Sequence, residues 1–218
     1  RFPNTRPKWM LTHPRSGLFM GIESIRGINL EFFDKIYFVA LKKHEDEYSF
    51  EKGFKQELND LNLLSKTELI YLDEETSSQS ETVYKAIIEN DIHGFITIKD
   101  SDNYFKCEFI DTVNKVSYYN LHKTSNINPS NKSYIKLDEN NIITNIVEKS
   151  IISPTFSIGG YSFNSAKDFI DLLGRMGSDA SRGIGIKGKI KKLANLQDVS
   201  FLGIEYVDAT KPEVMASR

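Results

Sequence analysis

The sequence predicts an α/β fold with a mixed, mainly parallel central sheet flanked by helices. Short apolar runs typical of buried strands, such as Lys35–Leu41, alternate with charged segments whose apolar residues recur at helical spacing. This alternation is typical of a sheet covered by helices on both faces. The chain has 218 residues and no strong linker, which favours a single domain over residues 1–218.

The first half of the chain carries the clearest alternation of strands and helices. Gly17–Ile28 has apolar residues at three-residue spacing and predicts a helix, and His44–Leu61 predicts another. Strands are expected at Lys35–Leu41, Thr67–Leu72 and Gly94–Lys99, with a helix at Ser80–Glu89 that begins at an N-cap serine, Ser78 or Ser80.

The second half of the chain predicts shorter strands joined by turns. The polar turn Asp138–Asn141 predicts a hairpin between its neighbours, and the polar stretch His122–Ser130 predicts a loop. Strands are expected at Lys115–Leu121, Ser133–Leu137, Ile142–Glu148, Phe156–Phe163 and Ser200–Val207, and helices at Ser165–Leu173 and near Lys187–Asn195.

Composition excludes some classes of protein. The formal net charge is −2, which argues against nucleic-acid binding, and the basic run Lys187–Lys192 is interpreted as a solvated helix face. The single cysteine, Cys107, lies in an aromatic run and predicts a buried, inert thiol in a reducing cytoplasm. No apolar stretch approaches the ~20 residues that cross a bilayer, so no membrane partner is expected.

An acidic pair follows one of the predicted strands. Asp100 and Asp102 come directly after Gly94–Lys99, and ligands of parallel sheets bind beyond the carboxyl ends of strands. Side chains at i and i+2 share a face, so both carboxylates could hold one Mg²⁺, which in turn binds phosphate oxygens. The alternative is a polar turn that simply closes the strand.

Basic residues near the start of the chain could neutralise phosphate charge. Lys8 and Arg1 are the candidates, and the alternative for both is an exposed position in a loop. Near the end of the predicted strand Ile142–Glu148, the pair Glu148 and Lys149 could orient a second substrate, or could be a surface charge pair.

Two further positions are ambiguous from the sequence. Gly159 and Gly160 lie inside a predicted strand, where glycine marks either a bulge or the close approach of a backbone or ligand. Asp208 follows the predicted strand Ser200–Val207 and is either a second metal ligand or a residue that ends the strand. The four histidines have no metal-ligand spacing, and no phosphate-binding P-loop motif occurs.

Taken in order, these segments resemble the sugar-phosphate and alcohol-phosphate nucleotidyltransferases, which have a Rossmann-like, glycosyltransferase-A-type fold. The segments that carry the resemblance are Arg6–Leu11, Ser77–Val83, Ile96–Phe105, Ile146–Lys149 and Ile158–Phe163. The resemblance implies a first strand and a glycine-rich loop before residue 1. It also implies that residues 1–110 bind the NTP and that residues 111–218 bind the acceptor.

The resemblance implies a role for each candidate residue. Lys8 and Asp102 would be catalytic. Mg²⁺ would be the cofactor, held by Asp102 with Asp100 and Asp208. The NTP would be bound by Arg1, Gln79 and Ser80, and the second substrate by Glu148, Lys149 and Gly160.

The segment Arg6–Pro14 resembles a branch of this family found in capsule biosynthesis. That branch implies CTP as the favoured donor and a small phosphorylated acceptor, with phosphoglutamine as the specific candidate. Three alternatives stay open: a sugar-1-phosphate nucleotidyltransferase, a metal-dependent glycosyltransferase that uses Asp100-Ser101-Asp102, and a nucleotide-binding module without catalysis. A homodimer is also open.

Overall fold

The computed structural model describes residues 6–107, 109, 111–124, 128–175 and 202–205. The strands are β1 (Ile36–Leu41), β2 (Thr67–Leu72), β3 (Ile96–Lys99), β4 (Lys115–Asn120), β5 (Ser133–Leu137), β6 (Ile143–Glu148), β7 (Thr155–Phe163) and β8 (Leu202–Glu205). The α-helices are α1 (Met20–Ile25), α2 (Lys42–Tyr48), α3 (Glu51–Asp60), α4 (Gln79–Glu89) and α5 (Ala166–Arg175). Short 3₁₀ helices are η1 (Lys8–Met10), η2 (Leu30–Phe32), η3 (Leu64–Lys66), η4 (Leu121–Lys123) and η5 (Pro129–Asn131).

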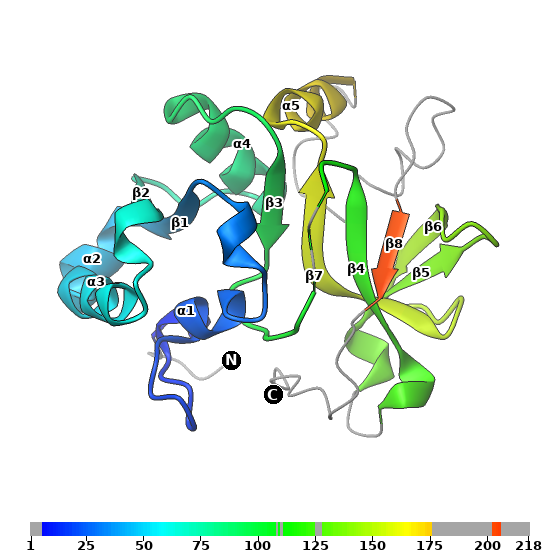
Figure 1. The fold of residues 1–218 in the computed structure, drawn as a ribbon, viewed down its shortest axis with the longest axis horizontal. Helices are drawn as coiled ribbons and strands as arrows, with labels where there is room; N and C mark the ends of the chain where they lie inside the picture. The colour runs from blue at the N-terminus through cyan, green and yellow to red at the C-terminus, as the bar shows by residue number, and fades with distance from the viewer. Residues whose placement is uncertain (1–5, 108, 110, 125–127, 176–201, 206–218) are drawn as a thin grey trace.

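Two sheets form the framework of the described chain. β1 and β2 make a parallel pair, with Ile36 opposite Thr67. The other sheet has six strands in the order β6-β5-β7-β4-β8, with β3 also paired to β7. In Figure 1 the β1–β2 pair lies with α2 and α3 on the left and the larger sheet on the right, with β3 between them.

The expected α/β architecture is confirmed, but the expectation of a mainly parallel sheet is not. In the six-stranded sheet the described pairs are antiparallel except for β4–β8. There are two reasons: β5 and β6 form the expected hairpin, and β7 runs antiparallel to β3, β4 and β5. In the hairpin turn, the Asp138 carboxylate accepts hydrogen bonds from the backbone N–H of Asn140 (2.9 Å) and Ile142 (2.8 Å).

The single helix expected over His44–Leu61 is two helices. Ser49 takes a left-handed backbone conformation (φ 48°) and separates α2 from α3. This break turns the chain so that Phe54 and Leu58 of α3 are completely buried. They pack in one hydrophobic cluster with Met10, Ile22, Ala40 and Phe50.

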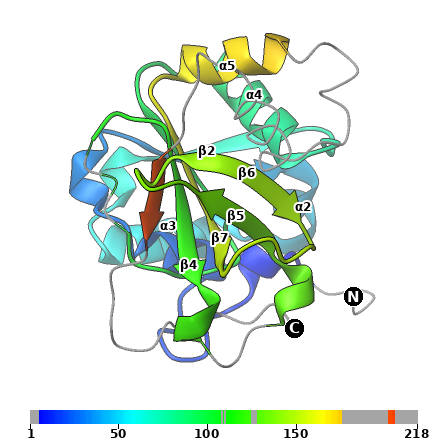
Figure 2. The same ribbon diagram turned by 90° about the vertical axis from the view of Figure 1, so that its right-hand side faces the viewer.

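Hydrophobic clusters also cover the six-stranded sheet. One joins α4 and α5 to residues such as Val116 and Tyr161, and Figure 2 shows these two helices together above the strands. Another contains Phe109, Phe156 and Cys107, which confirms the expectation of a buried thiol. In the described ranges, no helix is long and apolar enough to cross a membrane.

Some expectations fall partly or wholly outside the described residues. β8 lies inside the expected strand Ser200–Val207. The helix expected near Lys187–Asn195, and with it the basic run Lys187–Lys192, lies outside them.

Candidate functional site

The candidate site lies where β3 ends. The Nζ atom of Lys8, in η1, is 3.2 Å from Oδ2 of Asp102, in the turn that follows β3. The two residues are 94 positions apart in the sequence. Their side chains are 60% and 38% exposed, so this ion pair contributes little to stability. Both groups are therefore accessible to a ligand.

A second contact links the same turn to the start of α4. The amide Nε2 of Gln79 donates a hydrogen bond to Oδ1 of Asp100 at 2.6 Å. Ser78 caps this helix by accepting a hydrogen bond from the backbone N–H of Glu81, as one of the two sequence alternatives predicts. Ser80 is completely buried in the first turn of the helix. The structure thus brings Gln79 to the site and places Ser80 in the interior.

Lys99, the last residue of β3, holds the acidic turn from beneath. Its ammonium group donates to the backbone oxygens of Asp100 (2.7 Å) and Asn103 (2.8 Å) and to the side-chain oxygen of Asn103. It also lies 4.4 Å from the centre of the Phe105 ring. Burial lowers the pKa of Lys99 to about 7, although the charges of Asp100 and Asp102 oppose this shift. The partly buried Lys99 thus fixes this turn through its hydrogen bonds.

Gly159 of β7 provides the surface against which this turn packs. Gly159 has a φ of +85°, and its carbonyl accepts a hydrogen bond from the backbone N–H of Asp100 at 2.8 Å. A side chain at Gly159 would overlap the Asp100 carboxylate. Asn103 adds a hydrogen bond from Nδ2 to the carbonyl of Ile158 at 2.7 Å. Gly159 therefore fits the interpretation that glycine is needed where another part of the backbone approaches closely, here the turn at Asp100.

Gly160, expected to bind substrate, lies in the core. A Cβ atom there would come 2.7 Å from Oγ of Ser117 and 2.8 Å from the Phe105 ring. The pairing of β4 with β7 also shifts register here, between Val116 and Tyr118, so the bulge interpretation fits as well. Packing accounts for this glycine without a substrate.

The acidic pair does not behave as two neighbours on one strand face. β3 ends at Lys99, so strand alternation no longer applies, and Asp100 and Asp102 bind different partners. Among the described residues, no group of three His, Cys, Asp or Glu side chains could enclose a metal ion. Mg²⁺ does not need such a cage, because it is commonly held by one or two carboxylates, water and substrate phosphates. Asp102 fits that mode because its partner Lys8 is itself 60% exposed, whereas the carboxylate of Asp100 accepts a 2.6 Å hydrogen bond from Gln79.

The remaining candidates are not joined to this site by the described contacts. Glu148 and Lys149 stand at the end of β6, where their charged ends are 3.5 Å apart and about two-thirds exposed. In the part of the chain that the structure describes, no contact links them to Lys8 or Asp102. Arg1 and Asp208 lie outside the described residues.

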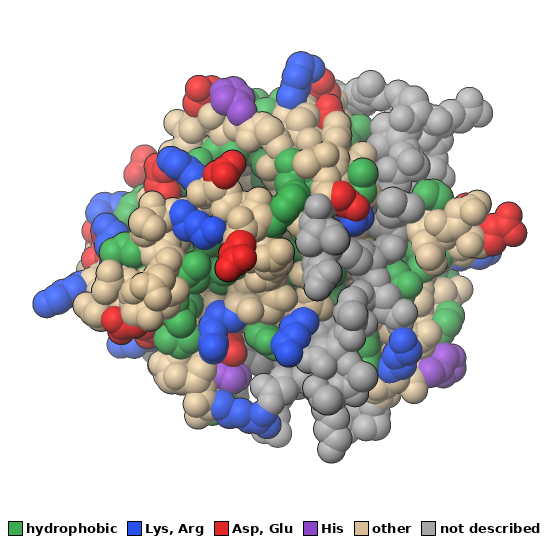
Figure 3. Space-filling view, viewed as in Figure 1, with side chains coloured by type: hydrophobic (Ala, Val, Ile, Leu, Met, Phe, Trp, Pro, Cys, Tyr) green, Lys and Arg blue, Asp and Glu red, His purple; other side chains and the backbone are tan. Residues whose placement is uncertain are grey.

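The described part of the molecular face in Figure 3 has no single sign of charge. Figure 3 shows basic and acidic side chains interspersed over the described part of the face that it draws. This agrees with the near-neutral composition. What distinguishes the site is the accessible Lys8–Asp102 pair on a turn that Lys99 anchors, rather than a broad electrostatic field.

Sequence reasoning missed Lys99 and Asn103. A signal was present, because a lysine stands between an apolar strand and an acidic pair in Ile96–Asp102. The side chain of Lys99 could pack inward beneath the carboxylates or stay in solvent beside them. The sequence does not decide between these two positions, so the partners of Lys99 could not be assigned without the fold.

Solved structures share this fold. A nucleoside-diphosphate-sugar pyrophosphorylase from Vibrio cholerae RC9 has a TM-score of 0.70 and 18% identity, and the match covers 93% of this chain and 85% of that one. An inositol-1-phosphate CTP transferase from T. maritima has a TM-score of 0.62 and 12% identity, with 90% and 76% covered. A UDP-glucose pyrophosphorylase complexed with UDP-glucose has a TM-score of 0.60 and 14% identity, with 93% and 84% covered.

These similarities show the fold. At 12–18% identity they do not by themselves carry an activity to this chain. No family model and no curated protein sequence matches the chain.

Proposed function

We propose that this chain is a nucleotidyltransferase, which transfers the NMP part of an NTP to a small phosphorylated acceptor and releases pyrophosphate. The observation that carries the proposal is the accessible contact between Lys8 and Asp102 at the carboxyl end of β3. Ligands of α/β sheets bind at such ends. The fold shared with structures described as pyrophosphorylases and a CTP transferase supports the same chemistry.

In the proposed reaction, a phosphate oxygen of the acceptor attacks the α-phosphorus of the NTP. The bond from the α-phosphorus to the bridging oxygen breaks, and pyrophosphate leaves with that electron pair. A phosphate oxygen is already anionic near neutral pH, so no general base is required. Positioning and electrostatic stabilisation then supply the catalysis.

The residues of the site divide this work. Lys8 offsets the negative charge that accumulates on the phosphate oxygens in the transition state. Asp102 would hold Mg²⁺, which would supply positive charge near the phosphates. Lys99 and Gln79 keep the acidic turn in place through their hydrogen bonds to Asp100 and Asn103. We assign the NTP to residues 1–110 and the acceptor, with Glu148 and Lys149, to residues 111–218.

Within this class, we favour CTP as donor and phosphoglutamine as acceptor, the activity of a CTP:phosphoglutamine cytidylyltransferase in capsule modification. Two observations support this choice: the resemblance of Arg6–Pro14 to a capsule-biosynthesis branch, and a structural neighbour described as a CTP transferase. A sugar-1-phosphate acceptor is the second candidate, because two structural neighbours are described as sugar-nucleotide pyrophosphorylases.

A pyrophosphate-release assay on the natural full-length polypeptide tests the proposal. Each of the four NTPs is offered with Mg²⁺ and with phosphoglutamine, glucose-1-phosphate or inositol-1-phosphate. We expect pyrophosphate only when donor and acceptor are both present, with the highest rate for CTP and phosphoglutamine. Release of NDP from a nucleotide sugar, without pyrophosphate from any pair, would instead identify a glycosyltransferase. Light scattering on the same sample distinguishes a monomer from a homodimer.

A further inference from the structure

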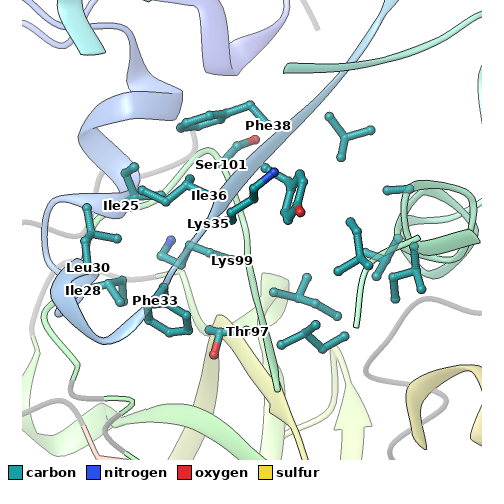
Figure 4. Close-up of a pocket in the computed structure, with 18 of the residues that line it drawn as sticks. Ile25, Ile28, Leu30, Phe33, Lys35, Ile36, Phe38, Thr97, Lys99 and Ser101 are labelled. Atoms are coloured by element: carbon teal, nitrogen blue, oxygen red, sulfur yellow. The ribbon is translucent and has the colours of Figure 1, made fainter. Parts of the chain in front are cut away.

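The strand that leads into the acidic turn, residues 100–103, has a strand beside it on one side. Within the described residues, β3 pairs with β7 alone. On the other side, Thr97 and Lys99 of β3 and Ser101 of the turn border a cavity of about 780 Å³ that lies between β1 and β3 (Figure 4). β7 is therefore the strand that can fix where β3 ends and the acidic turn begins.

β7 is irregular at the point where it contacts this turn. Val116 of β4 pairs with Tyr161 of β7, and Tyr118 of β4 pairs with Ser157 of β7. Between these two pairs β4 has one residue, Ser117, whereas β7 has three. Such a bulge interrupts the ladder of hydrogen bonds between two strands, so its backbone groups need other partners.

A buried hydroxyl group takes the place of the missing ladder bonds. Oγ of Ser117 accepts a hydrogen bond from the backbone N–H of Gly160 at 2.8 Å and donates one to the carbonyl oxygen of Gly160 at 3.1 Å. Ser117 is 0% exposed, so water does not reach these groups. Ser157 adds to this arrangement, because its Oγ accepts from the N–H of Gly159 at 3.4 Å and lies 3.2 Å from the hydroxyl of Tyr161.

The bulge presents two backbone carbonyl groups to the acidic turn. The carbonyl of Gly159 accepts from the N–H of Asp100 at 2.8 Å, and the carbonyl of Ile158 accepts from Nδ2 of Asn103 at 2.7 Å. These contacts hold the first and the last residue of the turn, and Asp102 lies between them. A shift of the bulge would therefore move the carboxylate of Asp102, and displacements of this kind are costly in an active site.

We infer that Ser117 is a positioning residue of the proposed site. Its buried hydroxyl, supported by Ser157 and Tyr161, fixes the bulge of β7, and the bulge holds the turn that carries Asp102. The catalytic consequence rests on the proposed function. The structural part, that Ser117 fixes the acidic turn, does not depend on it.

Hydrogen exchange tests the structural part without an activity. In Ser117→Ala, the amide of Asp100 should exchange at least about tenfold faster than in the wild type, relative to the amides of β5 and β6 in the same protein. Ser162→Ala is the matched control, because Ser162 is also 0% exposed, and its hydroxyl donates to the carbonyl of Val113 at 2.8 Å, beyond the bulge. It should leave the Asp100 amide as protected as in the wild type. Unchanged exchange of this amide in Ser117→Ala would overturn the inference.

Kinetics test the catalytic consequence. Ser117→Ala should raise the Mg²⁺ concentration for half-maximal pyrophosphate release about fivefold, because a displaced Asp102 would bind the metal less well. Loss of folded protein lowers kcat without moving this concentration, so Ser162→Ala should keep the wild-type value. Faster exchange at Asp100 with an unchanged Mg²⁺ dependence would overturn the role of Ser117 in the reaction. If the wild type releases no pyrophosphate from any pair, the proposed function fails, and exchange at Asp100 still decides whether Ser117 fixes the turn.

Tyr161→Phe is a milder change that decides the question if Ser117→Ala does not fold. It removes the hydroxyl beside Ser157 and keeps the ring in the core, and it should speed exchange of the Asp100 amide about threefold. Tyr134→Phe is the control, because Tyr134 is equally buried and donates to the carbonyl of Pro129 at 2.9 Å. Equal exchange of the Asp100 amide in the two tyrosine variants would overturn the inference.

Discussion

Two lysine–carboxylate pairs in this molecule differ in how they are built. Lys8 and Asp102 are 94 residues apart and meet because η1 packs beside the turn after β3. Glu148 and Lys149 are neighbours in sequence, and their contact needs no tertiary structure. A contact between distant residues depends on the whole fold for its geometry. The geometry of the first pair is therefore fixed by the tertiary structure before any ligand binds. The second is only a charge pair between sequence neighbours, and a bound substrate would have to fix its geometry.

An ion pair alone does not define the site either. Lys35 and Glu68 are also 3.2 Å apart, and Lys35 is 60% exposed, as Lys8 is. What the Lys8–Asp102 pair has in addition is a turn that is anchored by the partly buried Lys99 and packed on Gly159. Substitutions in these pairs test whether the Lys8–Asp102 pair has a function that the other ion pairs lack.

The largest effect is expected for Asp102→Asn. In the proposed mechanism this change removes the charge that would hold Mg²⁺, but it keeps the size of the side chain. Pyrophosphate release should fall at least about 1,000-fold with an unchanged melting temperature. Asp46→Asn, in an exposed pair with Lys42, is the control and should retain full activity. Wild-type turnover in Asp102→Asn would remove this residue from the site.

Lys8→Met should reduce turnover by roughly 100-fold, because one donor to the developing negative charge is lost. The matched control is Lys35→Met, which removes a lysine of equal exposure in an ion pair of equal length. Steady-state kinetics of both variants at saturating NTP provide the comparison. Similar rates for the two variants would mean that Lys8 is an ordinary surface lysine.

Lys149→Met tests whether the Glu148–Lys149 pair binds the acceptor. If Lys149 binds the phosphate of the acceptor, the KM for the acceptor should rise by about 10-fold while the KM for the NTP stays constant. Lys167→Met, in an exposed pair with Asp171, serves as control. An unchanged acceptor KM would leave the Glu148–Lys149 pair as surface charge only.

The smallest effect concerns stability and pH. Burial lowers the pKa of His44, and the charge of Lys43 adds a smaller effect. The centre of the His44 ring lies 6.3 Å from the centre of the Trp9 ring, and Trp9 is the residue after Lys8. The unfolded chain then binds a proton at His44 first as the pH falls below 6.5, so the folded state loses stability there.

Urea unfolding at pH 7 and pH 5 measures this loss. His44→Gln should lose less stability than the wild type over that interval, whereas His93→Gln, at an exposed position, should lose as much as the wild type. An equal loss in all three proteins would contradict the assignment.

The sequence predicted local elements better than their pairing. β2 and β5 match their expected bounds to the residue, since short apolar runs between polar turns mark strands clearly. The direction of pairing was not predicted, because β7 recruits partners from distant parts of the chain. The left-handed Ser49 carries no glycine signal, so the division between α2 and α3 was also missed.

The candidate site was predicted in part. Lys8 and Asp102 were selected from the order of motifs, and the structure brings them into contact, although their roles stay proposals. Asp100 was expected beside Asp102 on one strand face, but a turn rather than a strand governs both residues. Lys99 could not be placed from the sequence, because its role depends on the distance to Asn103 and Phe105.

The central claim is that nucleotide phosphates lie between Lys8 and Asp102. Calorimetric titration of CTP into the natural full-length polypeptide, with Mg²⁺ and with EDTA, tests it most directly when repeated on Asp102→Asn and Lys8→Met. The account predicts that Mg²⁺ strengthens CTP binding in the wild type, that Asp102→Asn abolishes this enhancement, and that Lys8→Met weakens binding in both conditions. Enhancement by Mg²⁺ that is equal in all three proteins would contradict it.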